Sequence, residues 1–230
     1  QGGSLDMKIM SVNAGSSSLK FKLFTMPEET VLCEGIFERI GQEIGTLKFE
    51  VAGTKEKSEI ALPDHSVAVN ILLDSLVEKG VVSSLEEIQG VGHRVVHGGE
   101  KFATSVIIDE AVLNGIISVS DLAPLHNPAN LTGISSFSKA LPNATQIAVF
   151  DTAFHQTMPE ESYIYATPYE WYEKYGVRKY GFHGTSHKFV SMRAADLMGK
   201  KPSEVNVVVA HLGNGASICA VKEGKSVDTT

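Results

Sequence analysis

Residues 12–21 read VNAGSSSLKF, and residues 210–221 read AHLGNGASICAV. In each, an apolar strand, small polar residues and a second apolar strand follow one another, which predicts a β-hairpin. Asn13-x-Gly15 in the first stretch corresponds to His211-x-Gly213 in the second. The recurrence is open to two interpretations: two hairpins that are alike by chance, or two phosphate-binding hairpins from the halves of a duplicated fold.

The turns of both predicted hairpins have the composition of an anion site. Gly15 is followed by Ser16, Ser17 and Ser18 and then by Lys20, while Gly213-Asn214-Gly215 forms the second turn. Closely spaced backbone N–H groups without bulky side chains bind phosphate oxygens well. Serine-rich turns also occur without any ligand. The pattern is not a P-loop, because the Gly-Lys-Ser at 224–226 has Cys219 where that motif requires glycine.

Composition places the chain among ordinary globular proteins. Of its 230 residues, 43% are apolar and 20% charged, which excludes disordered, collagenous and disulfide-scaffold classes. With a net charge of −7, the chain lacks the broad basic surface of a protein that binds nucleic acid or an anionic membrane, so we expect neither partner. Cys33 and Cys219 fit no metal or redox spacing, and we expect two buried, reduced thiols.

No apolar run approaches the roughly 18 residues that span a bilayer. The opening QGGSLDM has neither the basic nor the apolar region of a signal peptide. We interpret residues 1–6 as an addition ahead of a natural start at Met7, and we expect a cytoplasmic protein.

Strand-like and helix-like segments alternate along the rest of the chain, which indicates the α/β class. Ser66 is expected to open an amphipathic helix that Gly80 ends, and Asp109 is expected to cap another. Pro128 suits the first turn of a third helix. The remaining expected elements are a capping-box helix at Ser84 and Glu87, strands at 7–13, 19–24, 91–97, 145–150, 206–212 and 217–223, and a helix at 186–199.

The segment HRVVHGGE (93–100) carries a candidate anion-binding arginine. Alternate residues of a strand share a face, so Arg94 and Val96 are expected on one side. A guanidinium group beside an apolar residue suits a small carboxylate, because its fork matches carboxylate or phosphate in a bidentate pair. An internal salt bridge of Arg94 is the alternative.

Two further segments could contribute to a binding site. Asp151 directly follows the apolar strand TQIAVF, at the strand end where open α/β sheets bind ligands. Its carboxylate could hold Mg²⁺ or orient a nucleophile, or could cap the next turn. The proline-rich APLHNP (123–128) presents Leu125 and His126, which could line a pocket or only connect two helices.

The segment YGFHGTSH (180–187) precedes a predicted helix, with Thr185 or Ser186 expected as its N-cap. A histidine near a helix N-terminus suits hydrogen bonding to an anion, so His183 is the candidate. His183 and His187 also have the spacing of a helical zinc pair, but the glutamate of that motif and a third ligand are missing. For four other histidines we expect a core position with the ring nitrogens hydrogen-bonded: His65, His93, His97 and His187.

Taken together, these segments resemble the acetate/propionate/butyrate kinase family. The motifs VNAGSSSLKF, HRVVHGGE, LAPLHNP, VFDTAFHQTMP, YGFHGTSH and AHLGNGAS match in order from Met7 to the last residue. The resemblance implies an actin-like ATPase (ribonuclease H-like) duplicated α/β fold, with the first lobe at 7–154 and the beginning of a nucleotide-binding and dimerisation lobe at 155–230. Because family members continue much further, we expect a truncated chain that is inactive alone.

The resemblance also implies a role for each motif residue. Arg94, Asp151 and His183 would be catalytic, and Asn13 and Asp151 would meet Mg²⁺. Acetate would contact Arg94, Val96, Leu125, Phe182 and His126. The phosphates of ATP or ADP would contact Asn13, Ser16, Ser18, Lys20, His211, Gly213, Asn214 and Gly215.

The implied reaction is reversible, Mg²⁺-dependent transfer of the γ-phosphoryl group of ATP to acetate, which gives acetyl phosphate and ADP in a homodimeric enzyme. Three alternatives remain at this point. They are a propionate or butyrate kinase of the same family, a non-catalytic nucleotide-binding fragment, and a zinc hydrolase.

Overall fold

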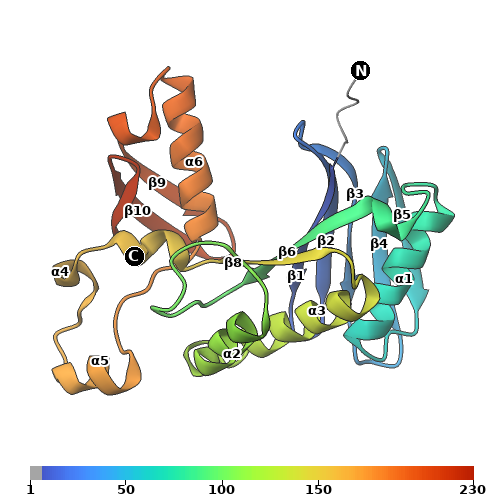
Figure 1. The fold of residues 1–230 in the computed structure, drawn as a ribbon, viewed down its shortest axis with the longest axis horizontal. Coiled ribbons are helices and arrows are strands. Elements are labelled where there is room, and N and C mark those ends of the chain that lie inside the picture. Colours follow the sequence, from blue (N-terminus) through green and yellow to red (C-terminus); the bar gives the residue numbers. More distant parts are fainter. Residues whose placement is uncertain (1–6) are drawn as a thin grey trace. The chain divides into compact units, whose positions relative to one another are not determined.

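The computed structural model describes residues 7–230; the six residues ahead of Met7, interpreted above as an addition, lie outside the described part. The described chain divides into two compact units (Figure 1). The first contains residues 7–95 and Val106–Ala148, and the second contains Val96–Ser105 and Val149–Thr230. The assignment of functional lobes to 7–154 and 155–230 stays a prediction.

The first unit is built on a mixed eight-stranded sheet with the strand order β5-β4-β3-β2-β1-β6-β8-β7. Strands β1 to β5 pair antiparallel in chain order, whereas β6 lies parallel to β1 and β7 antiparallel to β8. The strands are β1 (Met7–Ala14), β2 (Leu19–Met26), β3 (Thr30–Glu38), β4 (Gly45–Val51), β5 (Thr54–Ile60), β6 (Ile88–Val95), β7 (Val106–Ile107) and β8 (Thr145–Phe150).

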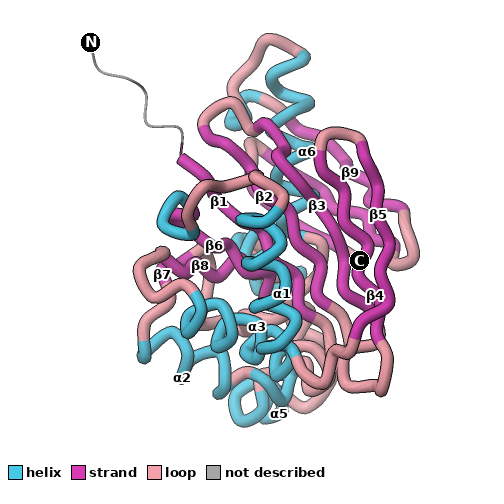
Figure 2. The backbone as a smooth tube through the Cα atoms, turned by 90° about the vertical axis from the view of Figure 1, so that its right-hand side faces the viewer, coloured by secondary structure: helices cyan, strands magenta, loops and turns pink. Residues whose placement is uncertain are grey.

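Helices α1 and α3 cover one face of this sheet (Figure 2) and share one core with it. Val12 and Phe21 point from the sheet into this core, where they meet Leu72 of α1 and Phe137 of α3. Each such side chain contributes about 1.5–3 kcal/mol of transfer free energy when buried. The helices of the unit are α1 (His65–Glu78), α2 (Glu110–Ser118) and α3 (Asn127–Ala140), with 3₁₀ turns η1 (Leu85–Glu87) and η2 (Ser120–Leu122).

Local capping signals locate most of these helix starts. Asp109 caps α2, Pro128 lies in the first turn of α3, and Ser84 and Glu87 form the predicted capping box. Helix α1 starts at His65, one residue before the predicted Ser66, because the carboxylate of Asp64 accepts a hydrogen bond from the Val67 N–H at 2.8 Å. That bond satisfies one of the four N–H groups left unpaired at a helix start.

The side chains of His65 and Asn130 form hydrogen bonds with the backbone of the β1–β2 hairpin turn. His65 Nε2 lies 2.8 Å from the carbonyl oxygen of Gly15 and 3.2 Å from that of Ser18. Carbonyl oxygens only accept hydrogen bonds, so this nitrogen carries the proton. From α3, the Asn130 side-chain amide donates to the Ala14 carbonyl at 2.8 Å. The carbonyl groups of Ala14, Gly15 and Ser18 at this turn are therefore all satisfied from within the unit.

The second unit is smaller and centres on a three-stranded antiparallel sheet with the order β11-β10-β9. Val209, Cys219 and Val221 form its buried core, next to Phe154. On the opposite face of the sheet, Val208 and Leu212 are exposed. Its elements are η3 (Ala153–Thr157), α4 (Glu160–Tyr163), α5 (Tyr169–Tyr175), α6 (Gly184–Leu197), η4 (Pro202–Glu204), β9 (Asn206–Leu212), β10 (Ala216–Lys222) and β11 (Lys225–Thr229).

Both cysteines are buried and free, as the sequence predicts. Burial raises the pKa of the Cys33 thiol to about 11, so this thiol stays protonated at neutral pH. In residues 7–230, no helix combines the length and the apolar character needed to cross a bilayer.

We predict that His93 makes the stability of the chain depend on pH. Burial lowers its pKa to about 4, against about 6.5 in an unfolded chain. The stabilisation that a neutral ring confers is therefore complete above pH 6.5 and is lost as the pH falls toward 4. His93→Gln should flatten the dependence of the unfolding free energy on pH in this window by up to about 1.4 kcal/mol per pH unit. Urea titrations at several pH values test this; a variant with an unchanged slope would contradict it.

We also predict that His65 stabilises the β1–β2 turn. His65→Ala removes the side-chain donor of the Gly15 carbonyl and one of the two donors of the Ser18 carbonyl, and should lower the free energy of unfolding by about 1–3 kcal/mol. Exchange of the Gly15 amide proton, which is bonded to the Ser18 carbonyl at 3.0 Å, should accelerate in the same variant. His65→Gln retains an N–H donor and serves as the matched control with a smaller effect. Equal stability and equal amide exchange in His65→Ala would refute the assignment.

Candidate functional site

Three cationic or amide side chains form a row across strands β2, β1 and β6. Lys20 pairs with Asn13, and Val12 pairs with His93, so Arg94 stands beside Asn13 one step further along the parallel pair. Val12 and His93 are buried in the core. Because alternate residues point to opposite faces, the row lies on the face of the sheet away from α1 and α3. An ammonium, an amide and a guanidinium group thus come together at the ends of β1 and β6.

The serine turn adjoins this row. The N–H of Gly15 donates to the Ser18 carbonyl at 3.0 Å, which closes the turn. Ser16 is exposed and Ser18 half-buried. A Cβ atom at position 15 would lie 2.6 Å from Ser18 Oγ, so glycine leaves room for that hydroxyl beside the backbone. The predicted phosphate-binding residues Asn13, Ser16, Ser18 and Lys20 therefore lie in one hairpin.

Leu125 and His126 lie just ahead of α3, at the same end of the first unit. His126 occupies the N-cap position of α3 without a side-chain capping bond, and the Leu125 side chain is 79% exposed. One helical turn further on, Asn130 binds the Ala14 carbonyl next to the serine turn. The two predicted residues are thus held near the hairpin, on an exposed loop.

In the second unit, Asp151 anchors the start of helix α6. It follows β8 directly and is 4% exposed. Its backbone carbonyl accepts a hydrogen bond from the Gly184 N–H at 2.8 Å. A Cβ atom at position 184 would lie 2.4 Å from that oxygen, so the close approach needs glycine.

Phe182 contacts His97, the residue that follows Val96 in the chain. Phe182 is 40% exposed, and its ring meets the His97 ring edge-on with centroids 5.7 Å apart. Val96, half-buried, is the neighbour of His97 in the chain. The Phe182 carbonyl accepts a hydrogen bond from His155 Nε2 at 2.9 Å, which fixes the backbone directly before His183.

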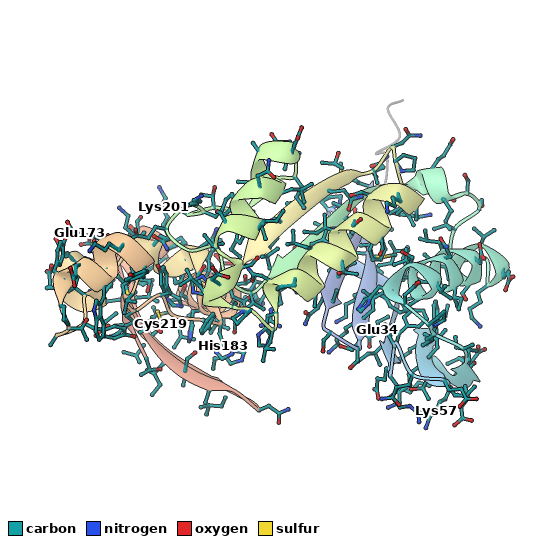
Figure 3. The ribbon with its side chains drawn as sticks, turned by 90° about the horizontal axis from the view of Figure 1, so that it is seen from below. Glu34, Lys57, Glu173, His183, Lys201 and Cys219 are labelled. Carbon is teal, nitrogen blue, oxygen red and sulfur yellow. The ribbon has the colours of Figure 1, made fainter. Side chains whose placement is uncertain are left out.

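His183 lies against the glycine-rich turn between β9 and β10 (labelled in Figure 3). Its ring stacks on His211, with centroids 4.0 Å apart and an interplanar angle of 18°. Its Nε2 would lie 3.3 Å from a Cβ atom at Gly215, so the absence of a side chain there admits the ring. Asn214, at the tip, is exposed. The structure thus brings together the predicted residues His183, His211, Gly213, Asn214 and Gly215.

The predicted N-cap at Thr185 or Ser186 is wrong, because α6 begins at Gly184 with His183 as its N-cap in a left-handed conformation (φ 56°). The bond from Gly184 to Asp151 starts the helix earlier than the hydroxyl residues would. Ser186 instead contacts His211 Nδ1 at 2.8 Å. A left-handed non-glycine residue is strained, and such residues cluster at functional sites.

The histidines at 183 and 187 share a serine. Ser217 Oγ lies 2.8 Å from His183 Nδ1 and 2.8 Å from His187 Nε2. Across residues 7–230, no group of three or more His, Cys, Asp or Glu side chains could hold a metal ion.

Sequence reasoning did not identify four residues whose hydrogen bonds hold the candidate site residues in place. His65, Asn130, His155 and Ser217 all contact predicted site residues or the backbone beside them, but each comes from a segment at least 27 positions away. The one local sign of this network was the four-residue spacing of His183 and His187, which places both rings on one face of a helix.

The buried histidines near the site carry no charge at neutral pH. Burial, and then the positive charge of Arg178, lowers the pKa of His97 to about 4. Burial, and then the neighbouring histidines, lowers the pKa of His187 to about 4. Positive charge toward an anionic ligand is therefore left to side chains such as Arg94 and Lys20.

Comparison with known proteins identifies relatives over nearly the whole chain. Acetate kinase of Bacillus mycoides is 61% identical over 97% of this chain, and that of Anoxybacillus flavithermus is 58% identical over the same share. The crystal structure of Porphyromonas gingivalis acetate kinase matches with a TM-score of 0.93 and 48% identity over 96% of the chain. A propionate kinase from Francisella tularensis matches with a TM-score of 0.91 and 44% identity over 97%.

The chain spans 56% of the length of each of these four relatives. The structural matches bear out the predicted fold class. The Acetokinase family itself matches residues 8–230. Because this match covers almost every residue, the chain belongs to the acetokinase family.

Proposed function

We propose that this polypeptide, completed to the length of its relatives, catalyses reversible Mg²⁺-dependent transfer of the γ-phosphoryl group of ATP to acetate. The products are acetyl phosphate and ADP. One observation carries the proposal: each unit presents a hairpin turn of small residues with anion-binding groups beside it. In the first unit these groups are Lys20 and Arg94, and in the second the ring of His183 lies against Gly215.

The first unit supplies the charged groups. Arg94 binds the carboxylate of acetate and, during transfer, the phosphoryl group, because its fork can pair with two oxygens at once. Asn13, Ser16, Ser18 and Lys20 meet the phosphoryl group through amide, hydroxyl and ammonium groups. His126 is a secondary contact.

The second unit supplies backbone N–H groups and histidine rings. His211, Gly213, Asn214 and Gly215 hold the nucleotide phosphates, with backbone N–H groups forming the concave anion site that such turns provide. His183 donates a hydrogen bond to the phosphoryl group as its charge spreads over the equatorial oxygens in the transition state. Asp151 positions substrate or metal from the end of strand β8, where its backbone carbonyl also accepts the first N–H of helix α6.

The chemistry needs no strong general base, because acetate is already ionised at neutral pH. A carboxylate oxygen forms a bond to the γ-phosphorus in line, while the bond from that phosphorus to the β,γ-bridging oxygen breaks. The electron pair of that bond leaves with ADP. Catalysis therefore consists of positioning and charge stabilisation, as in other phosphoryl transfers.

The donor types at Asn13 and Asp151 fit Mg²⁺, which prefers oxygen ligands and is commonly bound by one or two carboxylates together with substrate phosphates and water. A cage of three or more protein ligands is therefore not required, and residues 7–230 contain none. Asn13 and Asp151 would hold the ion, which would supply positive charge against the charge that develops on the phosphates.

The proposed contacts to the methyl group of acetate are the apolar side chains of Val96, Leu125 and Phe182. Within its unit, the Phe182 ring is held by its contact with His97. We propose, as the family resemblance implies, that the complete protein is a cytoplasmic homodimer.

We predict that Arg94→Ala in the completed polypeptide lowers kcat by roughly 10³–10⁵-fold, the contribution of one cationic group in phosphoryl transfer. Arg94→Lys, which keeps the charge and loses the fork, should recover part of this. Asp151→Asn should also lower kcat by orders of magnitude. Lys57→Ala, on exposed strand β5, is the matched control and should leave kcat unchanged. Near-normal turnover in Arg94→Ala or Asp151→Asn, measured by hydroxamate formation from acetyl phosphate, would rule out the role assigned to that residue.

We further predict that acetate is preferred over propionate and propionate over butyrate. One methylene group in an apolar pocket changes kcat/KM by roughly 10–200-fold. A coupled assay of ADP release with the three acids measures the order. Val96→Ala should leave more room for the acyl chain and reduce the difference in kcat/KM between acetate and the longer acids. A higher kcat/KM for propionate than for acetate in the unsubstituted protein would contradict the acetate assignment.

A further inference from the structure

The hydroxyl of Ser217 lies between two histidine rings that come from the first turns of helix α6. Its Oγ is 2.8 Å from His183 Nδ1 and 2.8 Å from His187 Nε2. Ser217 is 6% exposed and His187 is completely buried. A serine hydroxyl has one proton and two lone pairs. It could accept from both rings only by turning its own proton away from both, and among residues 7–230 its Oγ has no third hydrogen-bond partner. A buried O–H without an acceptor is costly, so Ser217 donates to one ring and accepts a hydrogen bond from the other.

Two arrangements satisfy both contacts. In the first, Ser217 donates to His183 Nδ1 and accepts from the Nε2–H of His187, so His183 carries its proton on Nε2. In the second, Ser217 donates to His187 Nε2 and accepts from the Nδ1–H of His183. A neutral His183 then has a bare lone pair on Nε2. The two arrangements differ in what His183 presents to an anion: a donor in the first, and an acceptor in the second.

The other nitrogen of His187 distinguishes the arrangements. His187 Nδ1 is buried and has no hydrogen-bond partner among the described residues. In the first arrangement this nitrogen is a bare acceptor, whereas in the second it is an N–H donor with no acceptor. Buried N–H groups without a partner are rare in folded proteins and cost more than a neglected lone pair. The unpartnered Nδ1 of His187 thus favours the first arrangement.

The ring of His187 is also neutral, which the first arrangement requires. Burial and the neighbouring rings of His155, His211 and His183 lower its pKa to about 4. Below that value both nitrogens would carry protons, and Nδ1 would again be an unpartnered donor. At neutral pH the single proton of His187 is available to Ser217.

The protonated nitrogen of His183 faces the glycine-rich turn. Its Nε2 and Cε1 would both lie 3.3 Å from a Cβ atom built on Gly215. Stacking on His211 at 4.0 Å holds the plane of the ring. We propose that Ser217 and His187 are positioning residues that hold His183 as its Nε2–H tautomer, so that it donates to an anionic oxygen at the Gly213–Gly215 turn.

The tautomer can be measured directly on the 230-residue chain. Long-range ¹H–¹⁵N correlation spectra of the histidine rings distinguish a protonated nitrogen from a bare one. At neutral pH we expect His183 to show a protonated Nε2 and a bare Nδ1, and His187 to show the same. A protonated Nδ1 on neutral His183 would overturn the proposal, and this readout needs no variant to fold.

Variants then test the dependence on each group. Ser217→Ala and His187→Leu remove the donor or the group that orients it, and His183 should become a mixture of tautomers in both. His187→Gln keeps a side-chain N–H for Ser217 and should restore the Nε2–H form. Ser226→Ala is the matched control, because this buried serine binds a different ring, His155 Nδ1, at 2.7 Å. An unchanged His183 tautomer in Ser217→Ala would overturn the proposal.

The catalytic consequence rests on the proposed function and is tested separately. In the completed polypeptide, Ser217→Ala and His187→Leu should lower kcat roughly 10–100-fold, the loss of one charge-assisted hydrogen bond. KM for acetate should change little, and His187→Gln should recover the rate. If the unsubstituted polypeptide forms no acetyl phosphate, the proposed function fails while the spectra still decide the tautomer. If it is active and the variants keep full kcat despite a shifted tautomer, the positioning role is refuted.

Discussion

A hydrogen bond donated from the Nε2 of an imidazole is the interaction on which both units depend. His65 donates to two carbonyl oxygens of the serine turn, and His155 donates to the carbonyl of Phe182. His93 Nε2 lies 2.6 Å from the side-chain amide oxygen of Gln146. His97 Nδ1 accepts a hydrogen bond from the Gly99 N–H, so the ring proton of His97 is on Nε2. His187 follows the same pattern through Ser217. Each of these buried rings holds a loop or strand end that would otherwise leave polar groups unpaired.

This use of histidine separates positioning from charge. Burial lowers the pKa of His93, His97, His155 and His187, so these rings are suited to act as fixed hydrogen-bond donors and not as cations. The positive charge for an anionic ligand then has to come from groups that remain ionised, such as an arginine. A net charge of −7 is compatible with anionic substrates for this reason. A few placed cations, held by neutral supports, replace a broad basic surface.

The sequence was most informative where a structure depends on neighbours in the chain. Both hairpins, the Ser84–Glu87 capping box and the Asp109 cap follow from residues within four positions of each other. Prediction failed where a distant contact decides the outcome. The start of α6 moved to Gly184 because the Asp151 carbonyl accepts its N–H. His65 is a satisfied core histidine, as expected, but nothing near it in the sequence shows that its partners are the Gly15 and Ser18 carbonyls.

The two hairpins share their geometry and differ in the chemistry of one residue pair. In each turn the first glycine donates to a carbonyl at the end of the turn, Gly15 to Ser18 and Gly213 to Gly215, both at 3.0 Å. The strand position two residues before that glycine pairs with Lys20 in the first hairpin and with Ser217 in the second. In the proposed function, lysine at this position brings a charge to the anion directly. Serine brings none, and in our proposal it fixes the proton of His183, so equivalent backbone positions give a cationic contact in one unit and an oriented histidine donor in the other.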